Sequence, residues 1–356
     1  MKRLATFSIV AVLILSVLAA GCSSGTTKNP ASPTPSNGAQ PAKKLKVAMI
    51  TDVGGLGDHG FNDAAYAGLK RAQEELGVQI NVVESKEVGD YPTNLRTLAQ
   101  SGYDLIFAVG AMMTDAVTAV ATEYPNTKFA IIDGTVDKLP NVTSALYREQ
   151  EAAFLLGAFA AQMTKTNTVG FVGGMRIPVL ERFEAGFRAG VQSMNPKVKV
   201  LVAYTGSFND VGKGKETANT LFQDGADMVS AAAGACNLGV FQAAKEKGDG
   251  YWALGAGTGQ FNLAPDKILA SQVKRIDNTG FEIIKAFTQG NFKSGITVYG
   301  LKEGGGDLSI SPTLKDKIPA AVLAKVNSLR QAIISGQIVP PPTLKDLANF
   351  QPPKVQ

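Results

Sequence analysis

The tripeptide Phe-Asn-Asp occurs twice in the chain, at residues 61–63 and again at residues 208–210. Each copy follows a strand-like run and a glycine-bearing turn, and each precedes a helix-like run. In an open α/β sheet, ligands bind at the carboxyl ends of strands, next to the starts of helices. A repeated tripeptide is common in a long chain, so the interpretation depends on this placement. The two copies predict two similar lobes, which present the rings of Phe61 and Phe208 to a shared cleft.

Acidic side chains directly follow two of the predicted strands, at Asp52 and Asp133. Strand-end carboxylates accept hydrogen bonds from amines or hydroxyls, and aromatic faces hold planar apolar ligands by stacking and dispersion. These residue types together predict a binding site. Each also has a purely structural explanation: a Phe before a helix is often a hydrophobic staple, an Asp caps turns, and Asn62 and Asn209 are suited to helix N-caps.

Residues 55–60 read Gly-Leu-Gly-Asp-His-Gly, which matches the dinucleotide-binding fingerprint after a predicted strand, and Glu84 ends the next strand. An export signal at the N-terminus argues against a cytoplasmic nicotinamide cofactor. A wide strand-to-helix loop, where backbone closely approaches a ligand or the other lobe, explains the glycines more simply. Residues 255–260 fail the same fingerprint at the last position. We therefore expect no cofactor.

Catalytic arrangements have little support in the sequence. No nucleophile elbow, P-loop or metal-ligand spacing is present, and His59 is the only histidine. Cys236 lies among small residues and is typical of a packed small hydrophobe. The net charge is +5 without a dense Lys/Arg cluster, so nucleic-acid binding is not predicted. The residues indicate a binder with no metal site rather than a catalyst.

The N-terminus has the pattern of an export signal. Lys2 and Arg3 precede an apolar stretch over 5–20, and small residues lead to Cys22. Ala-Gly-Cys resembles the lipobox of bacterial lipoproteins, with Ala19 where Leu is usual. We predict a signal peptide over 1–21 and a lipidated (palmitate-bearing) Cys22, which anchors the protein on the extracytoplasmic face of the cell membrane. Ordinary secretory cleavage with an unmodified cysteine is the alternative.

A proline-bearing polar segment over 22–44 predicts a disordered tether. Strand-like and helix-like runs alternate after it, which predicts parallel sheets with right-handed crossovers. The predicted strands are 45–51, 80–83, 105–109, 129–132, 168–172, 198–202, 228–230, 252–254, 268–273 and 296–299.

The strand-and-helix pattern restarts near residue 149, so the α/β body contains two doubly wound lobes of about equal size. The segment from residue 268 onward is too short for a third lobe and is expected to cross back and complete both. The predicted bounds are an N-terminal lobe over 45–148 completed by part of 270–300, a C-terminal lobe over 149–268 completed by part of 301–340, and a tail over 341–356.

Several motifs resemble the basic membrane protein (BMP) family of lipoproteins, the PnrA-like, purine-nucleoside-binding substrate-binding proteins of ABC transporters. They are residues 51–58 with 61–63, 129–133, 151–157, 170–174, 183–187, 206–210, 238–244 and 273–275, which follow one another in order. The resemblance implies a type I periplasmic-binding-protein fold, with two Rossmann-like lobes joined by a three-crossing hinge. It also implies capture of a purine nucleoside or related base between the lobes and delivery to an ABC permease with its ATPase.

The resemblance assigns roles to individual residues. The implied ligand-binding residues are Asp52, Phe61, Asn62, Met112, Asp133, Phe208, Gly257 and Lys274. The base would stack between the two phenylalanines, and the aspartates and the asparagine would bind polar edges of the nucleoside. The lysine would contact hydroxyls of the ligand, and Met112 or its neighbour Met113 would line the pocket.

One segment departs from the family pattern. The family usually reads Gly-Val-Asp-Ser-Asp-Gln where residues 255–260 read Gly-Ala-Gly-Thr-Gly-Gln, so Gly257 and Gly259 replace both acids. The first acid is expected to hold the ribose diol. Our hypothesis is that this pocket does not bind a ribose in the usual way, and that it binds a free base, a deoxynucleoside or another planar ligand instead. The alternative is that Thr258, Lys274 or water replaces the missing acid.

Two other functions are alternatives to transport. The first is a lipoprotein receptor that senses a nucleoside-like signal without transport, which the sequence does not distinguish from a transport protein. The second is an enzyme that acts on nucleosides, such as a hydrolase. The lack of a recognisable acid/base or metal arrangement argues against the second, so the protein is not expected to be an enzyme.

Overall fold

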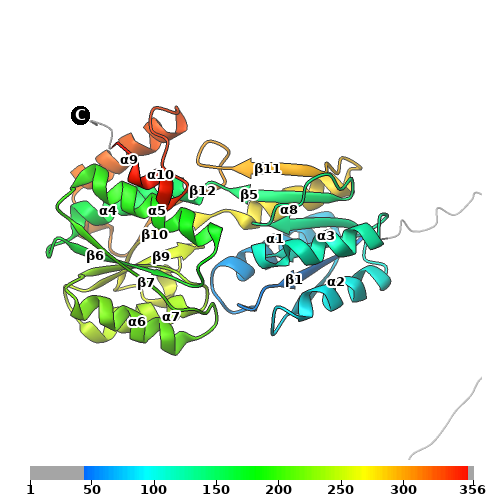
Figure 1. Cartoon of the computed structure of the whole chain (residues 1–356), viewed down its shortest axis with the longest axis horizontal. Coiled ribbons are helices and arrows are strands. Elements are labelled where there is room, and N and C mark those ends of the chain that lie inside the picture. The colour runs from blue at the N-terminus through cyan, green and yellow to red at the C-terminus, as the bar shows by residue number, and fades with distance from the viewer. Residues whose placement is uncertain (1–43, 352–356) are drawn as a thin grey trace, which may run out of the picture. The chain divides into compact units, whose positions relative to one another are not determined.

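The computed structural model describes residues 44–351. The predicted signal peptide, the predicted lipidation site Cys22 and the tether up to residue 43 lie outside the described residues. Two six-stranded sheets organise the described part of the chain, and each is covered by helices (Figure 1).

The sheet of the N-terminal lobe has the strand order β11-β5-β4-β3-β1-β2, and all its neighbouring strands are parallel. Its strands are β1 (Lys46–Thr51), β2 (Gln79–Glu84), β3 (Leu105–Val109), β4 (Lys128–Ile132), β5 (Val142–Tyr147) and β11 (Gly295–Tyr299). Its helices are α1 (Phe61–Leu76), α2 (Asp90–Gln100), α3 (Thr114–Glu123) and α8 (Ile276–Thr288), with a 3-10 turn η1 (Ala111–Met113) before α3.

Helices bury both faces of this sheet, which explains why its strands read as continuous apolar runs. In β1, Val47 and Met49 pack in the cluster under α1 and α8, while Ala48 and Ile50 pack in the cluster under α2 and α3. Successive side chains of a strand point to opposite faces, so one apolar run supplies both cores.

The sheet of the C-terminal lobe has the order β12-β10-β9-β8-β6-β7, in which only β12 is antiparallel to its neighbour. Its strands are β6 (Thr168–Gly173), β7 (Lys199–Tyr204), β8 (Met228–Ala232), β9 (Trp252–Gly257), β10 (Ile268–Lys274) and β12 (Gly306–Ile310). Its helices are α4 (Glu149–Met163), α5 (Pro178–Met194), α6 (Val211–Gln223), α7 (Cys236–Lys247), α9 (Ala320–Ile334) and α10 (Leu344–Ala348), with 3-10 turns η2 (Phe261–Leu263) and η3 (Lys315–Lys317).

The chain passes between the two sheets three times, from β5 to α4, from β10 to α8 and from β11 to β12. The final strands are therefore exchanged, because β11 completes the first sheet and β12 the second. The predicted α/β fold of two doubly wound lobes with a three-crossing hinge is confirmed.

Three local features differ from the sequence-based expectation. Strands β5 and β12 were not among the predicted strands. The sequence predicts a helix over 240–245, whereas α7 begins at Cys236, so this cysteine lies in the first turn of a helix. Helix α10 lies inside the segment 341–356, for which the sequence predicts only a tail, and its Leu347 is buried against the C-terminal lobe.

Helices α4 and α5 of the C-terminal lobe approach each other so closely that glycine is required at their contact. A Cβ atom on Gly157 would lie 2.0 Å from the carbonyl oxygen of Phe187, and one on Gly190 would lie 2.0 Å from that of Phe154. Each clash is with backbone, which cannot rotate away as a side chain can.

We expect Gly157→Ala to lower the free energy of unfolding by about 1–3 kcal/mol, because the added methyl group overpacks a rigid contact. Urea denaturation of the variant and the wild type measures this. Gly280→Ala in α8 is the matched control, since its Cβ atom would have no neighbour closer than 4.0 Å. The control should be neutral or stabilising by about 0.4–1 kcal/mol. Equal losses in the two variants would contradict the prediction.

Candidate functional site

A cavity lies at the carboxyl ends of strands from both sheets, which is where an open α/β sheet binds its ligand. It provides about 100 Å³ of space, several times the roughly 10–15 Å³ that one water molecule needs. All eight residues predicted as ligand-binding line it: Asp52, Phe61, Asn62, Met112, Asp133, Phe208, Gly257 and Lys274. The structure therefore brings together residues that are as much as 222 positions apart in the sequence.

The two phenylalanine rings reach the cavity from different lobes. Phe61 is the first residue of α1 in the N-terminal lobe, and Phe208 lies in the loop between β7 and α6 of the C-terminal lobe. Aliphatic and aromatic side chains of α5 complete this wall, notably Leu180 and Phe183. The sequence does not mark these α5 residues as site residues, because an apolar residue at helical spacing is usually part of a core.

The two Phe-Asn-Asp copies occupy different positions relative to their helices. The first copy forms the opening turn of α1, whose N-cap is Gly60, so the N-cap role considered for Asn62 is wrong. In the second copy Asp210 is the N-cap of α6 and accepts a hydrogen bond from the backbone N–H of Lys213 at 3.0 Å. Asn209 therefore precedes the cap and is not the cap itself.

Asn62 is oriented by two carboxylates. Its Nδ2 atom donates to Asp52 Oδ1 at 2.8 Å and to Asp58 Oδ2 at 3.3 Å. Asp58 is itself held by the backbone N–H groups of Gly60, Asn62 and Asp63. A carboxylate only accepts, so the amide NH₂ must face these oxygens. The Asn62 Oδ1 atom is left buried and without a partner in the described structure, at a residue 1% exposed, and it is available to a ligand donor.

The two carboxyl groups that hold Asn62 are poorly solvated. Burial raises the pKa of Asp52 to about 6, although hydrogen bonds from Asn62 and from the Gly54 N–H act in the opposite direction. Burial also raises the pKa of Asp58. A ligand that donates hydrogen bonds to the Asp52 carboxylate would replace part of the hydration lost on burial, so this wall favours a donor-rich ligand edge.

Lys274 lies at the centre of a buried ion-pair network where the chain crosses between the lobes. Its Nζ atom contacts Asp133 Oδ1 and Oδ2 at 2.6 Å each and Glu149 Oε1 at 2.7 Å. The other oxygen of Glu149 accepts from Arg182 Nε. Burial raises the pKa of Asp133 to about 6, and the adjacent Lys274 ammonium partly offsets this. An ammonium group has three N–H donors, so these acceptors occupy all of them.

Aromatic rings surround the same ammonium group. The Nζ atom of Lys274 lies 4.5 Å from the ring centroid of Tyr147, 5.4 Å from that of Phe61 and 5.9 Å from that of Phe183. Cation–π attraction strengthens when the cation is desolvated. The ion-pair network is thus continuous with the aromatic wall of the cavity. Glu149 and Arg182 were not predicted, and no local motif in the sequence distinguishes them from surface charges of α4 and α5.

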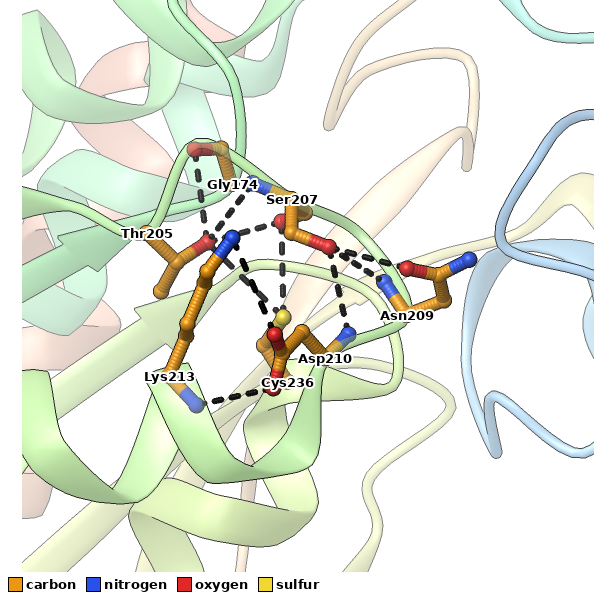
Figure 2. Close-up of polar contacts among 7 residues, drawn as sticks. All are labelled: Gly174, Thr205, Ser207, Asn209, Asp210, Lys213 and Cys236. Atoms are coloured by element: carbon orange, nitrogen blue, oxygen red, sulfur yellow. Dashed lines mark hydrogen bonds and ion pairs between the residues drawn. The ribbon is translucent and has the colours of Figure 1, made fainter. Parts of the chain in front are cut away.

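Cys236 is buried and forms no disulfide. Its Sγ atom donates to the carbonyl oxygen of Ser207 at 3.4 Å and accepts from Thr205 Oγ1 at 3.7 Å (Figure 2). Burial raises the pKa of the thiol, which keeps it protonated and unreactive. Cys236 therefore packs as predicted and helps to fix the loop that carries Phe208.

Over residues 44–351, no helix is long and apolar enough to cross a membrane. Within the same range, no group of three or more His, Cys, Asp and Glu side chains is arranged to hold a metal ion. The arrangement that the structure does provide is an apolar cavity with one ring from each lobe, a free amide oxygen and carboxylates of raised pKa. Such a cavity is suited to a planar ligand that donates hydrogen bonds.

The chain is similar to several known proteins. The family model described as "ABC transporter substrate-binding protein PnrA-like" matches residues 45–343. The "ABC transporter nucleoside-binding protein BmpA" of Lactococcus lactis is 34% identical and covers 96% of this chain and 99% of its own length. An uncharacterized lipoprotein of Pyrococcus abyssi is 41% identical over 84% of this chain and 74% of its own. The crystal structure of an ABC transporter solute-binding protein from Aeropyrum pernix has a TM-score of 0.80 at 33% identity, covering 86% of this chain and 96% of that one.

We expect Asp52→Asn to raise the free energy of unfolding at pH 7.5 by about 1–3 kcal/mol, because the ionised carboxylate is disfavoured by burial in the folded state. The folded-state pKa of about 6 lies above the ordinary value of 3.8. As the pH falls through 6 the folded protein takes up this proton first, so the wild type gains stability and the advantage of the variant disappears near pH 4. Urea denaturation of both proteins across this range measures the effect, and parallel pH profiles would contradict it.

Proposed function

The chain belongs to the family of PnrA-like ABC transporter substrate-binding proteins, and from this premise we propose that it captures a purine nucleoside or a related base between its lobes. A protein of this class binds a small molecule and passes it to a permease. We propose that it does so on the extracytoplasmic face of the membrane, anchored through lipid on Cys22. The names of the lipoprotein relatives support this location.

The observation that carries the proposal is the pair of rings, Phe61 and Phe208, that line one cavity from opposite lobes. A purine is a flat aromatic bicycle, and stacking on aromatic side chains contributes about 1–3 kcal/mol per base. Rings on two lobes contact both faces of such a base only when the lobes close. Ligand binding would then stabilise the closed form, which is the motion that a substrate-binding protein uses.

The polar groups of the N-terminal wall support a purine as well. The free Asn62 Oδ1 atom and the Asp52 carboxylate are neighbouring acceptors. The exocyclic amine of adenine, or the ring N–H and amine of guanine, would supply donors to such a pair. A ligand without donors on that edge would leave buried acceptors unpaired, which costs about 1–3 kcal/mol for each group.

We further propose that the sugar is held weakly or is absent. Gly257 offers no side chain where relatives are expected to place a carboxylate. The two residues considered as replacements are engaged elsewhere: Lys274 donates to Asp133 and Glu149, and Thr258 Oγ1 donates to the carbonyl oxygen of His59 at 3.0 Å. Neither side chain is free to bind a ribose diol without giving up these bonds.

Isothermal titration calorimetry with matched ligands tests both parts of the proposal. Adenosine and guanosine are compared with their 2′-deoxy forms and with adenine and guanine. We expect at least one purine series to bind, with the deoxynucleoside within about tenfold of the ribonucleoside, since the sugar contributes little. Deoxy forms weaker by about a hundredfold or more would contradict the sugar proposal, and no binding by any purine would contradict the ligand class. Release of free base during incubation, followed by chromatography, would contradict a pure binding role.

Removing either ring should weaken purine binding by about 5- to 150-fold, which corresponds to the loss of one stacking contact. We expect this for Phe61→Ala and Phe208→Ala, measured by calorimetry with the best-binding purine. Phe287→Leu is the control, because Phe287 packs on Phe292 in the N-terminal lobe and does not line the cavity. Unchanged affinity in both alanine variants would contradict the stacked arrangement.

A further inference from the structure

Residues 53–60, within the loop between β1 and α1, are held in shape by carboxylates of their own lobe. Asp63 accepts hydrogen bonds from the backbone N–H groups of Gly57 and His59, each at 2.9 Å. Asp58 accepts from the N–H of Gly60 at 2.9 Å. With these amides bonded within the lobe, the loop presents preformed carbonyl groups to its surroundings.

The first of these carbonyl groups accepts a hydrogen bond from the C-terminal lobe. Asn209 Nδ2 donates to the Val53 carbonyl oxygen at 3.1 Å, across 156 residues of sequence. The direction of the amide is set by Ser207, whose hydroxyl donates to Asn209 Oδ1 at 2.9 Å and accepts from the Asn209 and Asp210 N–H groups. Figure 2 shows this hydroxyl at the centre of the contacts that hold the loop. The amide NH₂ is therefore directed at the other lobe.

A second carbonyl group of the same loop accepts a hydrogen bond from a different part of the C-terminal lobe. Thr258, just after β9, donates to the His59 carbonyl oxygen at 3.0 Å, across 199 residues. Beside it, the backbone of Gly257 lies against Gly60, because a Cβ atom on Gly257 would be 2.9 Å from the Gly60 Cα atom. Gly257 also has φ +102°, a backbone conformation that residues other than glycine rarely adopt.

We propose that Asn209 and Thr258 form an interlobe clasp on the 53–60 loop, and that this clasp sets how slowly the ligand leaves. Neither side chain lines the cavity, so they act as positioning residues that hold the lobes closed and do not touch the ligand. Gly257 is required for the clasp because it lets the two backbones meet. This inference uses the proposed nucleoside ligand only as a probe of release.

The clasp has a kinetic signature. Its hydrogen bonds exist only when the lobes are closed, so their free energy stabilises the closed complex and not the open encounter complex. Loss of a clasp bond therefore speeds dissociation and leaves association unchanged. A hydrogen bond of this kind corresponds to roughly a 2- to 12-fold change in an equilibrium constant. The two bonds lie at separate ends of the loop and should act additively.

Stopped-flow displacement of the purine found by calorimetry measures the release rate. We expect Asn209→Ala and Thr258→Val each to raise the dissociation rate about 2- to 12-fold, with the association rate unchanged. The double variant should combine the two effects. Thr258→Ser keeps the hydroxyl and should release ligand at the wild-type rate. Gly257→Ala should also speed release, because its methyl group keeps the lobes apart.

A double variant that releases ligand at the wild-type rate would overturn the clasp, as would a change confined to the association rate. Failure of the proposed function gives a different result, namely a wild-type protein that binds no purine. In that case small-angle X-ray scattering of the ligand-free proteins tests whether the clasp holds the lobes closed. A larger radius of gyration for the double variant than for the wild type supports the clasp, and equal radii overturn it.

Discussion

The arrangement of the two lobes depends on one buried ammonium group. Lys274 ends β10 at one crossing of the hinge, Glu149 begins α4 just after another, and Asp133 follows β4 in the N-terminal sheet. Removing one partner from a buried ion pair costs about 3–5 kcal/mol, because it leaves an uncompensated charge. Opening and closing of the lobes must therefore keep these groups together. The network is thus suited to serve as a fixed point between the lobes, and in our proposal the contacts that change on opening are those of the 53–60 loop.

The fold was largely readable from the sequence, because a strand buried on both faces has an unbroken apolar run and its neighbours in sequence are helices. The two missed strands depart from that pattern for identifiable reasons. Strand β5 carries Thr143 and Ser144, and only Arg148 separates it from α4, so no turn residues mark its end. Strand β12 is the antiparallel edge of its sheet and includes Gly306, Asp307 and Ser309. Both strands lie next to hinge crossings, where the usual pattern of a strand, a loop and a helix is absent.

The candidate site was predictable to the extent that it lies at strand ends. Asp52 and Asp133 directly follow apolar runs, and the repeated tripeptide marks the two rings. The sequence does not distinguish the partners that orient these groups. Glu149 and Arg182 are ordinary charged residues of helices until the fold brings them to Lys274. The repeat also conceals a difference, since Asn62 faces the cavity whereas the equivalent Asn209 bonds to the opposite lobe. Identical tripeptides acquire different roles because one opens its helix and the other precedes the N-cap.

In the proposed function, Gly257 connects ligand specificity with closure of the lobes. A carboxylate at this position would add an acceptor for a sugar, but its Cβ atom would meet the Gly60 backbone in the closed arrangement described here. A glycine lacks this acceptor but allows direct contact between the lobes. Beside it, Thr258 donates a hydrogen bond to the His59 carbonyl oxygen. A chain with the acid would have to close less tightly at this point, with the sugar filling part of the gap. On this argument, weak recognition of ribose and a directly bonded interlobe contact are two consequences of the same residue.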